Sequence, residues 1–460
     1  MKIDYAQSKE QIKNFSFEKK LYDYIIIGSG PAAVTLYKTI LSKKKKSKIL
    51  ILEEGDLFKK NFKKVQSKHL KINLKSRAFT VGGTSSIWAN ISSYFEEFEM
   101  KSRWKKKQIN LWPISHNSLL REYKNLDKKY QFFFNRFKKK RISIPFEVRP
   151  FYATTKPINF KKFINFNQID FIYNFRVDTI DENKKISIAY SIDKKIKFIA
   201  KKIIICCGGI ESVKLVQKSL LNKKLKSIKN KKLVGKFFMD HPKFDLGYIK
   251  YPKIDIINKI ELVKKDNLIS YYGISLKKNI QAKNKLLNTY IRFEKTNNRI
   301  SRLIDKLNIP IIKNILSTKK IYRVRLFTEM MPNINNSIIS KKNKTLVILR
   351  PSQIDYKTIN LLSKKVREYF SLKPEKETSL KFKDKLKRFE GASHHMGGLR
   401  FDNNKDLSVI DKNLRILGLK KIYVCSSAIF PTSGSVNPTM TICALSSRLG
   451  NHLNKNKNER

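Results

Sequence analysis

The chain has 460 residues, of which 41% are hydrophobic and 30% charged; this fits a globular protein with a large core and excludes a disordered one. Its formal net charge of +62 comes from lysines spread along the whole chain, without a basic arm or a recognised nucleic-acid motif. We therefore expect diffuse surface charge, no nucleic-acid partner, and at most a peripheral contact with an anionic membrane.

No segment offers the ~18 or more apolar residues of a membrane span. The first residues lack the apolar core of a secretory leader. The four cysteines show no CxxC spacing, so neither zinc nor a redox dithiol is indicated. These features predict a cytoplasmic protein with buried thiols.

A βαβ unit is predicted in the segment YIIIGSGPAAVTLYKTILSKKKKSKILILEEG. Apolar runs before Gly28 and before Glu53 predict two buried parallel strands, and the residues between them follow a helical period. In such a unit Gly28 permits a tight turn, Gly30 lets the backbone approach a pyrophosphate, and Ala33 lets helix and strand pack closely. Glu53 ends the second strand, where an acid binds ribose hydroxyls. The segment therefore predicts a dinucleotide site.

Two further glycine-rich segments follow. RAFTVGGTSSIWAN contains Gly82, Gly83 and Ser85, which offer donors to a phosphate or a flavin, although an ordinary loop explains this segment better when it is taken alone. IIICCGGIESVKLV predicts another strand and helix of the same doubly wound sheet.

The middle of the chain predicts a second domain. Between residues 246 and 385, strand-like runs at 269–274, 321–328 and 345–349 alternate with basic helical stretches. This pattern favours an antiparallel sheet with surrounding helices.

Two of the six histidines, His394 and His395, stand side by side in RFEGASHHMGGLRFD. A metal site would need further ligands at suitable spacing, and adjacent side chains point in different directions, so no metal site is predicted. A catalytic base and a structural turn both stay open. Later in the chain, Asn437 at an N-cap and Pro438 at N1 would start a helix well, so Asn437 has a structural explanation. His241 in MDHP is interpreted as a loop hydrogen-bonder.

Seven motifs in collinear order resemble the glucose–methanol–choline (GMC) oxidoreductase family, whose members are FAD enzymes that oxidise alcohols. They are YIIIGSGPAA with ILILEEG, VGGTSSIW, WPIS, IIICCGGIES, VGKFFMDHP, EMMPN, and the block from SHHMGG to NPTMT. The tryptophan in VGGTSSIW is nearest in style to the sugar-oxidising, pyranose-oxidase-like branch.

The resemblance implies roles for particular residues. His394 falls where the family places its catalytic histidine, and Asn437 where it places the partner histidine or asparagine. Ile87 stands where some members of the branch attach FAD covalently through a histidine, so we expect FAD to be held non-covalently. The predicted cofactor contacts are Gly28, Gly30, Ala33, Glu53, Gly82, Gly83, Ser85, Val177, Pro438 and Thr439.

The chain also departs from the family pattern. Gly398 stands where threonine is usual, and Ser426 where aspartate or glycine is common. We expect Gly397 and Gly398 to form a turn that brings the chain close to the flavin. The central region is short for the family, which bears on the shape of the substrate pocket.

The predicted fold is α/β: a Rossmann-like FAD-binding domain with a doubly wound, mainly parallel sheet, and a second α+β substrate domain built on an antiparallel sheet. The FAD-binding domain is predicted to be discontinuous (residues 1–115, 165–245 and 386–460), with the substrate domain formed by 116–164 and 246–385.

The predicted reaction is hydride transfer from an alcohol or sugar hydroxyl carbon to flavin N5, with His394 as the base. The substrate is expected to be a small alcohol or carbohydrate, and no motif specifies the electron acceptor. Two alternatives stay open: a lipid-alcohol or sterol oxidoreductase at a membrane surface, and a polyanion-binding protein that keeps the fold without turnover.

Overall fold

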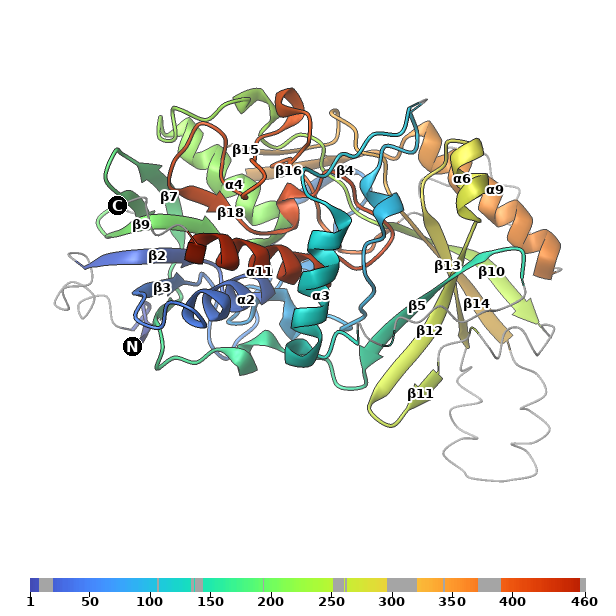
Figure 1. Ribbon diagram of the computed structural model, residues 1–460, viewed down its shortest axis with the longest axis horizontal. Helices are drawn as coiled ribbons and strands as arrows, with labels where there is room; N and C mark the ends of the chain where they lie inside the picture. Colours follow the sequence, from blue (N-terminus) through green and yellow to red (C-terminus); the bar gives the residue numbers. More distant parts are fainter. Residues whose placement is uncertain are drawn as a thin grey trace.

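The computed structural model describes residues 1–7, 20–105, 107–133, 136, 144–192, 194–250, 260, 263–295, 321–341, 344–370 and 390–455. Within these residues the strands form sheets of eight, seven and three strands. Figure 1 shows the eight-stranded sheet at one end of the molecule and the seven-stranded sheet at the other. No helix in the described part of the chain is long and apolar enough to span a membrane.

The eight-stranded sheet has the order β1-β6-β3-β2-β9-β8-β7, and β18 also pairs with β9. Its strands are β1 (Lys2–Asp4), β2 (Leu21–Ile27), β3 (Ile49–Leu52), β6 (Asp170–Tyr173), β7 (Val177–Glu182), β8 (Ser187–Ser191), β9 (Lys197–Ile205) and β18 (Ile422–Val424). Only the pairings β7–β8 and β8–β9 are antiparallel in this sheet. The whole of β3 and the carboxyl-terminal parts of β2 (residues 25–27) and β9 (residues 203–205) are apolar and buried, as a parallel sheet covered on both faces requires. The predicted mainly parallel sheet is confirmed.

Four long helices accompany this sheet: α2 (Pro31–Leu41), α3 (His116–Tyr130), α4 (Gly208–Leu221) and α11 (Thr439–Lys455). α2 and α11 lie side by side (Figure 1). Gly450 of α11 allows this close approach, because a Cβ there would come within 2.8 Å of the Thr39 Cβ. α3 packs on α11, and α4 packs on β7. Short 3-10 helices are η1 (Leu74–Ser76), η2 (Gly83–Ser86), η3 (Glu97–Met100), η5 (Phe160–Phe163), η6 (Lys231–Leu233), η8 (Lys405–Leu407) and η9 (Ser427–Ile429).

The seven-stranded sheet is antiparallel throughout and has the order β11-β12-β13-β14-β10-β17, with β5 also on β12. Its strands are β5 (Glu147–Thr154), β10 (Pro242–Lys250), β11 (Val263–Lys265), β12 (Leu268–Ser275), β13 (Thr289–Lys295), β14 (Ile321–Thr328) and β17 (Glu390–Gly391). α6 (Lys278–Lys283) and α9 (Gln353–Phe370) lie at this end of the molecule (Figure 1). The ring centroid of Phe151 on β5 lies 4.9 Å from that of Tyr271 on β12 and 4.5 Å from that of Tyr290 on β13, so aromatic contacts join these three strands. The predicted antiparallel sheet is confirmed, whereas the domain boundaries stay a prediction.

The three-stranded sheet consists of β15 (Ser337–Lys341), β16 (Lys344–Leu349) and β4 (Gln66–His69). β16 pairs antiparallel with β15 and parallel with β4. The strand predicted at 345–349 is therefore real, but its assignment to the sheet of the second domain is wrong. A distant segment, β4, takes up its second edge, and nothing in the local sequence reveals that pairing.

Candidate active site

A cavity of about 1110 Å³ lies where the carboxyl ends of β2, β3 and β9 meet the segments 392–395 and 437–439. Ligands bind at this edge of open α/β sheets, because loops and helix N-termini converge there. Sites for drug-sized ligands measure roughly 300–1,000 Å³. The cavity therefore has room for a dinucleotide together with a small substrate.

The glycines of the βαβ unit leave the backbone open toward the cavity. Gly28 has a φ of 97°, and a Cβ there would lie 2.7 Å from the Cys206 carbonyl oxygen, so only glycine fits this turn. A Cβ on Gly30 would come no closer than 4.0 Å to another atom, the Gly82 carbonyl oxygen. Both glycines line the cavity, and α2 begins beside them at Pro31. A phosphate could thus approach both the backbone and a helix N-terminus.

Ser29 joins the two glycine-rich segments to Glu53. The Ser29 N–H and hydroxyl donate to Glu53 Oε2 at 2.8 and 2.7 Å, and the hydroxyl oxygen accepts the Gly82 N–H at 3.0 Å. The Gly55 N–H donates to Glu53 Oε1 at 2.7 Å. Burial raises the pKa of Glu53, and these hydrogen bonds oppose the shift. A carboxylate has about four acceptor positions, so Glu53 keeps one for a further hydroxyl in the cavity.

Most of the predicted cofactor residues line the cavity: Gly28, Gly30, Glu53, Gly83, Ser85, Val177, Pro438 and Thr439. Ala33 and Gly82 are not part of its wall, and Ala33 is fully buried, which agrees with a packing role. The Ser85 hydroxyl donates to the Gly82 carbonyl at 2.6 Å and accepts the Phe160 N–H at 2.9 Å. Its hydrogen therefore bonds to the protein and is not directed at a ligand. Ile87 lines the cavity and has no atom suited to a covalent bond with a flavin.

The two predicted catalytic residues meet in the wall of the cavity. Asn437 Nδ2 lies 2.9 Å from His394 Nε2, and both residues line the cavity. The Ile442 N–H donates to the Pro438 carbonyl at 2.9 Å, so Pro438 rather than Asn437 occupies the N-cap position of α11. The helix therefore starts one residue later than the sequence predicts, and the Asn437 amide is available to His394.

His241 and Asp240, in the segment MDHP, complete this group. His241 Nδ1 lies 2.9 Å from His394 Nδ1, and His241 Nε2 lies 3.1 Å from the Ser433 carbonyl oxygen. Asp240 Oδ1 accepts the backbone N–H of His241 at 2.7 Å and that of His394 at 2.8 Å. Sequence reasoning assigned His241 only to a loop hydrogen bond and did not consider Asp240. The MDHP motif was the one indication that could have singled them out.

All three clustered histidines are held in the neutral form. Burial lowers the pKa of His241 to about 4 and that of His395 to about 3. Burial, followed by the charges of His241, His395 and Lys243, also lowers the pKa of His394 well below its usual value. Burial raises the pKa of Asp240 to about 6, although backbone N–H groups oppose the shift. A neutral imidazole can accept a proton, so His394 is chemically suited to act as a base.

Gly397 and Gly398 do not line the cavity. They instead allow two segments of the chain to pack closely. A Cβ on Gly397, with φ 78°, would lie 2.1 Å from the Phe237 carbonyl oxygen. A Cβ on Gly398, with φ 99°, would lie 2.6 Å from Val213 Cγ2, which explains why threonine is absent here. The expectation that these glycines bring the chain close to the flavin is therefore wrong. They let the 394–398 segment lie against residues 235–239.

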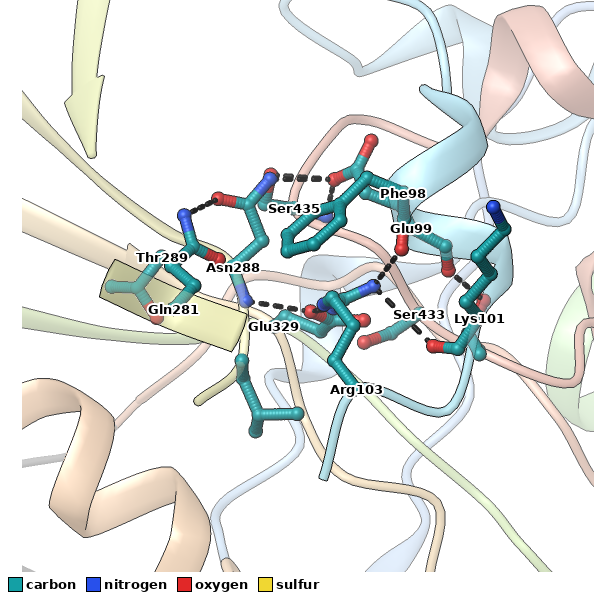
Figure 2. Close-up of polar contacts among 12 residues, drawn as sticks. Phe98, Glu99, Lys101, Arg103, Gln281, Asn288, Thr289, Glu329, Ser433 and Ser435 are labelled. Atoms are coloured by element: carbon teal, nitrogen blue, oxygen red, sulfur yellow. Dashed lines mark hydrogen bonds and ion pairs between the residues drawn. The ribbon is translucent and has the colours of Figure 1, made fainter. Parts of the chain in front are cut away.

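A buried ion-pair network contacts the loop of residues 431–437 through Ser435 (Figure 2). Glu99 accepts hydrogen bonds from the Ser435 N–H and hydroxyl at 2.8 Å each, and from Asn288 Nδ2 at 3.1 Å. Arg149 Nη1 and Nη2 donate to the two Glu99 oxygens at 2.9 Å. Burial alone would raise the pKa of Glu99, but the charge and hydrogen bonds of Arg149 hold that pKa below its usual range. Residues of the second sheet thus fix the loop that carries Asn437.

Comparisons with known proteins agree with this geometry. Residues 340–446, which include His394 and Asn437, match the family model described as GMC oxidoreductase. This part of the chain is therefore similar to GMC oxidoreductases. A comparison of the chain with curated proteins gave no match.

Solved structures share the fold over nearly the whole chain. A pyridoxine 4-oxidase from Mesorbium loti superimposes with a TM-score of 0.61 at 12% identity, covering 94% of this chain and 99% of its own. A formate oxidase superimposes with a TM-score of 0.56 at 13% identity, covering 95% and 99%. A formate oxidase from Aspergillus oryzae RIB40, whose description concerns FAD modification, has a TM-score of 0.56 at 12% identity with the same coverage. At these identities the likeness establishes the fold.

Proposed function

We propose that this protein is a GMC-type, FAD-dependent enzyme that oxidises the CH–OH group of a small alcohol or carbohydrate, with His394 as the base. One observation carries the proposal: the His394–Asn437 pair, 2.9 Å apart, lines the same cavity as a dinucleotide-type βαβ unit. The similar structures are those of a pyridoxine 4-oxidase and of formate oxidases, one of them described for its FAD modification, which is in keeping with a flavin-dependent oxidation.

The residues present fit FAD. The open backbone at Gly28 and Gly30 suits a pyrophosphate, and the remaining acceptor position of Glu53 suits a ribose hydroxyl. The N-terminus of α11 at Thr439 adds a second positive dipole end to the wall of the cavity. Ile87 offers no nucleophile, so the group would be held non-covalently. When bound, FAD supplies the acceptor for the hydride of the carbinol carbon.

The chain itself supplies the proton acceptor and the orientation. His394 Nε2 accepts the proton of the substrate hydroxyl, which a neutral imidazole with a lowered pKa can do. Asn437 Nδ2 donates a hydrogen bond, and an amide nitrogen does not compete for the proton. Together they hold the oxygen of the substrate at one place and thereby orient its C–H bond.

The first test is purification, a visible spectrum for bound flavin, and anaerobic bleaching with sugars, polyols, pyridoxine-like alcohols and long-chain alcohols. Bleaching by a small alcohol or sugar supports the proposal. Bleaching by long-chain alcohols alone would replace the substrate class with lipid alcohols. Colourless protein that binds DNA or anionic vesicles, with steep loss of binding in salt, would replace the proposal with polyanion binding.

The second test uses a matched pair of variants. His394→Ala should keep the flavin and slow its anaerobic reduction by about 100-fold or more, as the loss of a general base requires. His69→Asn is the control, because His69 is exposed with φ 72°, a conformation that asparagine adopts readily. An unchanged rate of flavin reduction in His394→Ala would refute the assignment of the base.

A further inference from the structure

His394 is held between two partners on opposite sides of its ring. Its Nε2 faces Asn437 Nδ2 at 2.9 Å, and its Nδ1 faces His241 Nδ1 at 2.9 Å. The far nitrogen of His241, Nε2, faces the Ser433 carbonyl oxygen at 3.1 Å. These three contacts form one continuous line of hydrogen bonds from a backbone carbonyl to the cavity.

The chemistry of the two ends fixes the direction of this line. A carbonyl oxygen only accepts, so His241 Nε2 carries a hydrogen. A neutral imidazole has one N–H, so His241 Nδ1 is a lone pair and must accept from His394 Nδ1. His394 Nε2 is then unprotonated, and its lone pair accepts the Asn437 amide N–H, which only donates. Both ends of the line therefore require the same tautomer of His394.

The Ser433 carbonyl that starts the line is rigidly placed. The Ser433 hydroxyl accepts the Met330 N–H at 2.9 Å and donates to the Met330 carbonyl at 3.2 Å. The adjacent Glu329 is fully buried, pairs with Arg103 and accepts the Asn288 N–H at 2.7 Å (Figure 2). The carbonyl is thus anchored to the seven-stranded sheet independently of His241.

The two histidines are also fixed relative to each other through their backbones. Asp240 Oδ1 accepts both of their N–H groups, at 2.7 and 2.8 Å. The segments pair as an antiparallel ladder: Met239 and Met396 exchange hydrogen bonds at 2.8 and 2.9 Å, and the Ala392 N–H donates to the His241 carbonyl at 2.9 Å. The contact between the rings is therefore built into the fold.

We infer that His241 is a positioning residue that holds His394 in the tautomer with an unprotonated Nε2 and shares the proton that His394 takes up. The inference rests on the proposed function. The O–H bond of the substrate breaks and an N–H bond forms at His394 Nε2; FAD, when bound, would supply the acceptor for the hydride of the carbinol carbon. The proton on His394 Nδ1 passes to His241 Nδ1, whose Nε2–H stays in place. One positive charge is gained and is spread over the two rings, whose backbone N–H groups donate to the Asp240 carboxylate.

The tautomer is measured directly by NMR of the flavin-bound enzyme with ¹⁵N-labelled histidine. Only six histidines contribute signals, and loss of one set in His394→Ala assigns His394. We expect His394 to be protonated at Nδ1 and His241 at Nε2. The opposite tautomer of His394 would overturn the inference. This readout does not need turnover, so it stands even if no alcohol reduces the flavin and the proposed function fails.

The kinetic test compares His241→Leu, which removes both ring nitrogens, with His241→Asn, which can place an amide oxygen near the former Nδ1. His241→Leu should keep its flavin and slow anaerobic reduction about 10- to 100-fold with KM changed less than about 2-fold, a part of the effect of losing the base. His241→Asn should recover at least a tenfold part of this loss. Equal rates for wild type and His241→Leu would overturn the inference.

A control and a reserve complete the design. His116→Leu removes another ring that contacts a backbone carbonyl, that of Phe95 at 2.8 Å, but it lies outside the cavity wall and should leave the rate unchanged. If His241 had only a structural role, His241→Leu and His241→Asn would both lose flavin and would both reduce it equally slowly. That pattern would also overturn the inference. If His241→Leu does not fold, the inference is tested by the tautomer of His394 in the wild type and by the rate of flavin reduction in His241→Asn.

Discussion

The buried pair of Arg149 and Glu99 gives the sharpest prediction about stability. Arg149→Met keeps the bulk of the side chain but removes two hydrogen bonds of 2.9 Å to Glu99 and one of 2.8 Å to the Ser435 hydroxyl. Glu99 has no exposed side-chain surface, so its charge cannot turn to water. Removing one partner of a buried ion pair costs about 3–5 kcal/mol, and we expect the free energy of unfolding to fall by that amount.

The comparison variant is Lys278→Met. Lys278 Nζ lies 2.6 Å from Glu96 Oε2, but 38% of the Lys278 side chain is exposed. Exposed ion pairs contribute about 0–1 kcal/mol, so this variant should lose several-fold less stability. Urea unfolding at equal flavin occupancy, followed by circular dichroism, measures both variants. A loss below about 1 kcal/mol for Arg149→Met would refute the reasoning.

The same pair predicts a pH dependence. In the folded protein the pKa of Glu99 lies below its ordinary value of 4.5, because Arg149 outweighs the effect of burial. A lowered folded pKa stabilises the fold above the ordinary pKa, and this stability is lost as pH falls through the folded value. The difference in the free energy of unfolding between wild type and Arg149→Met should therefore be largest at neutral pH and become smaller in acid. A gap that is constant from neutral to acid pH would contradict the assignment of the effect to the ion pair.

Three further predictions concern the site. Gly28→Ala should lose flavin and about 1–2 kcal/mol or more of stability, seen by absorbance and urea unfolding, because φ is 97° and a Cβ would lie 2.7 Å from the Cys206 carbonyl. Glu53→Gln should raise the flavin Kd about 10-fold or more, since an amide oxygen that accepts both Ser29 donors leaves an NH2 group facing the Gly55 N–H; an unchanged Kd in a flavin titration contradicts this. Because burial lowers the pKa of His394 below 6.5, it stays neutral in mild acid, and stopped-flow flavin reduction should keep its full rate at pH 6.5 and somewhat below; a half-maximal rate at pH 6.5 would exclude the lowered pKa.

The sequence by itself determined the first half of the site. The apolar runs, the glycines and Glu53 lie within one short βαβ unit, where local periodicity and backbone freedom decide the structure. The structure shows the strand predicted at 24–27 within β2 (Leu21–Ile27) and the strand predicted at 49–52 as β3, with the helix between them. The turn at residue 28 needs a positive φ, which glycine adopts without strain. This requirement was visible in the sequence because it depends on the residue type alone.

Only the tertiary structure decided the second half. The rings of His241 and His394 meet although they lie 153 residues apart in the chain, and Ser433 reaches His241 from a third segment. Their contact depends on the ladder between residues 235–241 and 392–398, and on the glycines that let the two segments approach. No local pattern records such a pairing, because its free energy comes from burial and hydrogen bonds between segments that meet only in the folded chain. The sequence therefore predicted His394 as the base, and only the fold showed that the His241 ring contacts it.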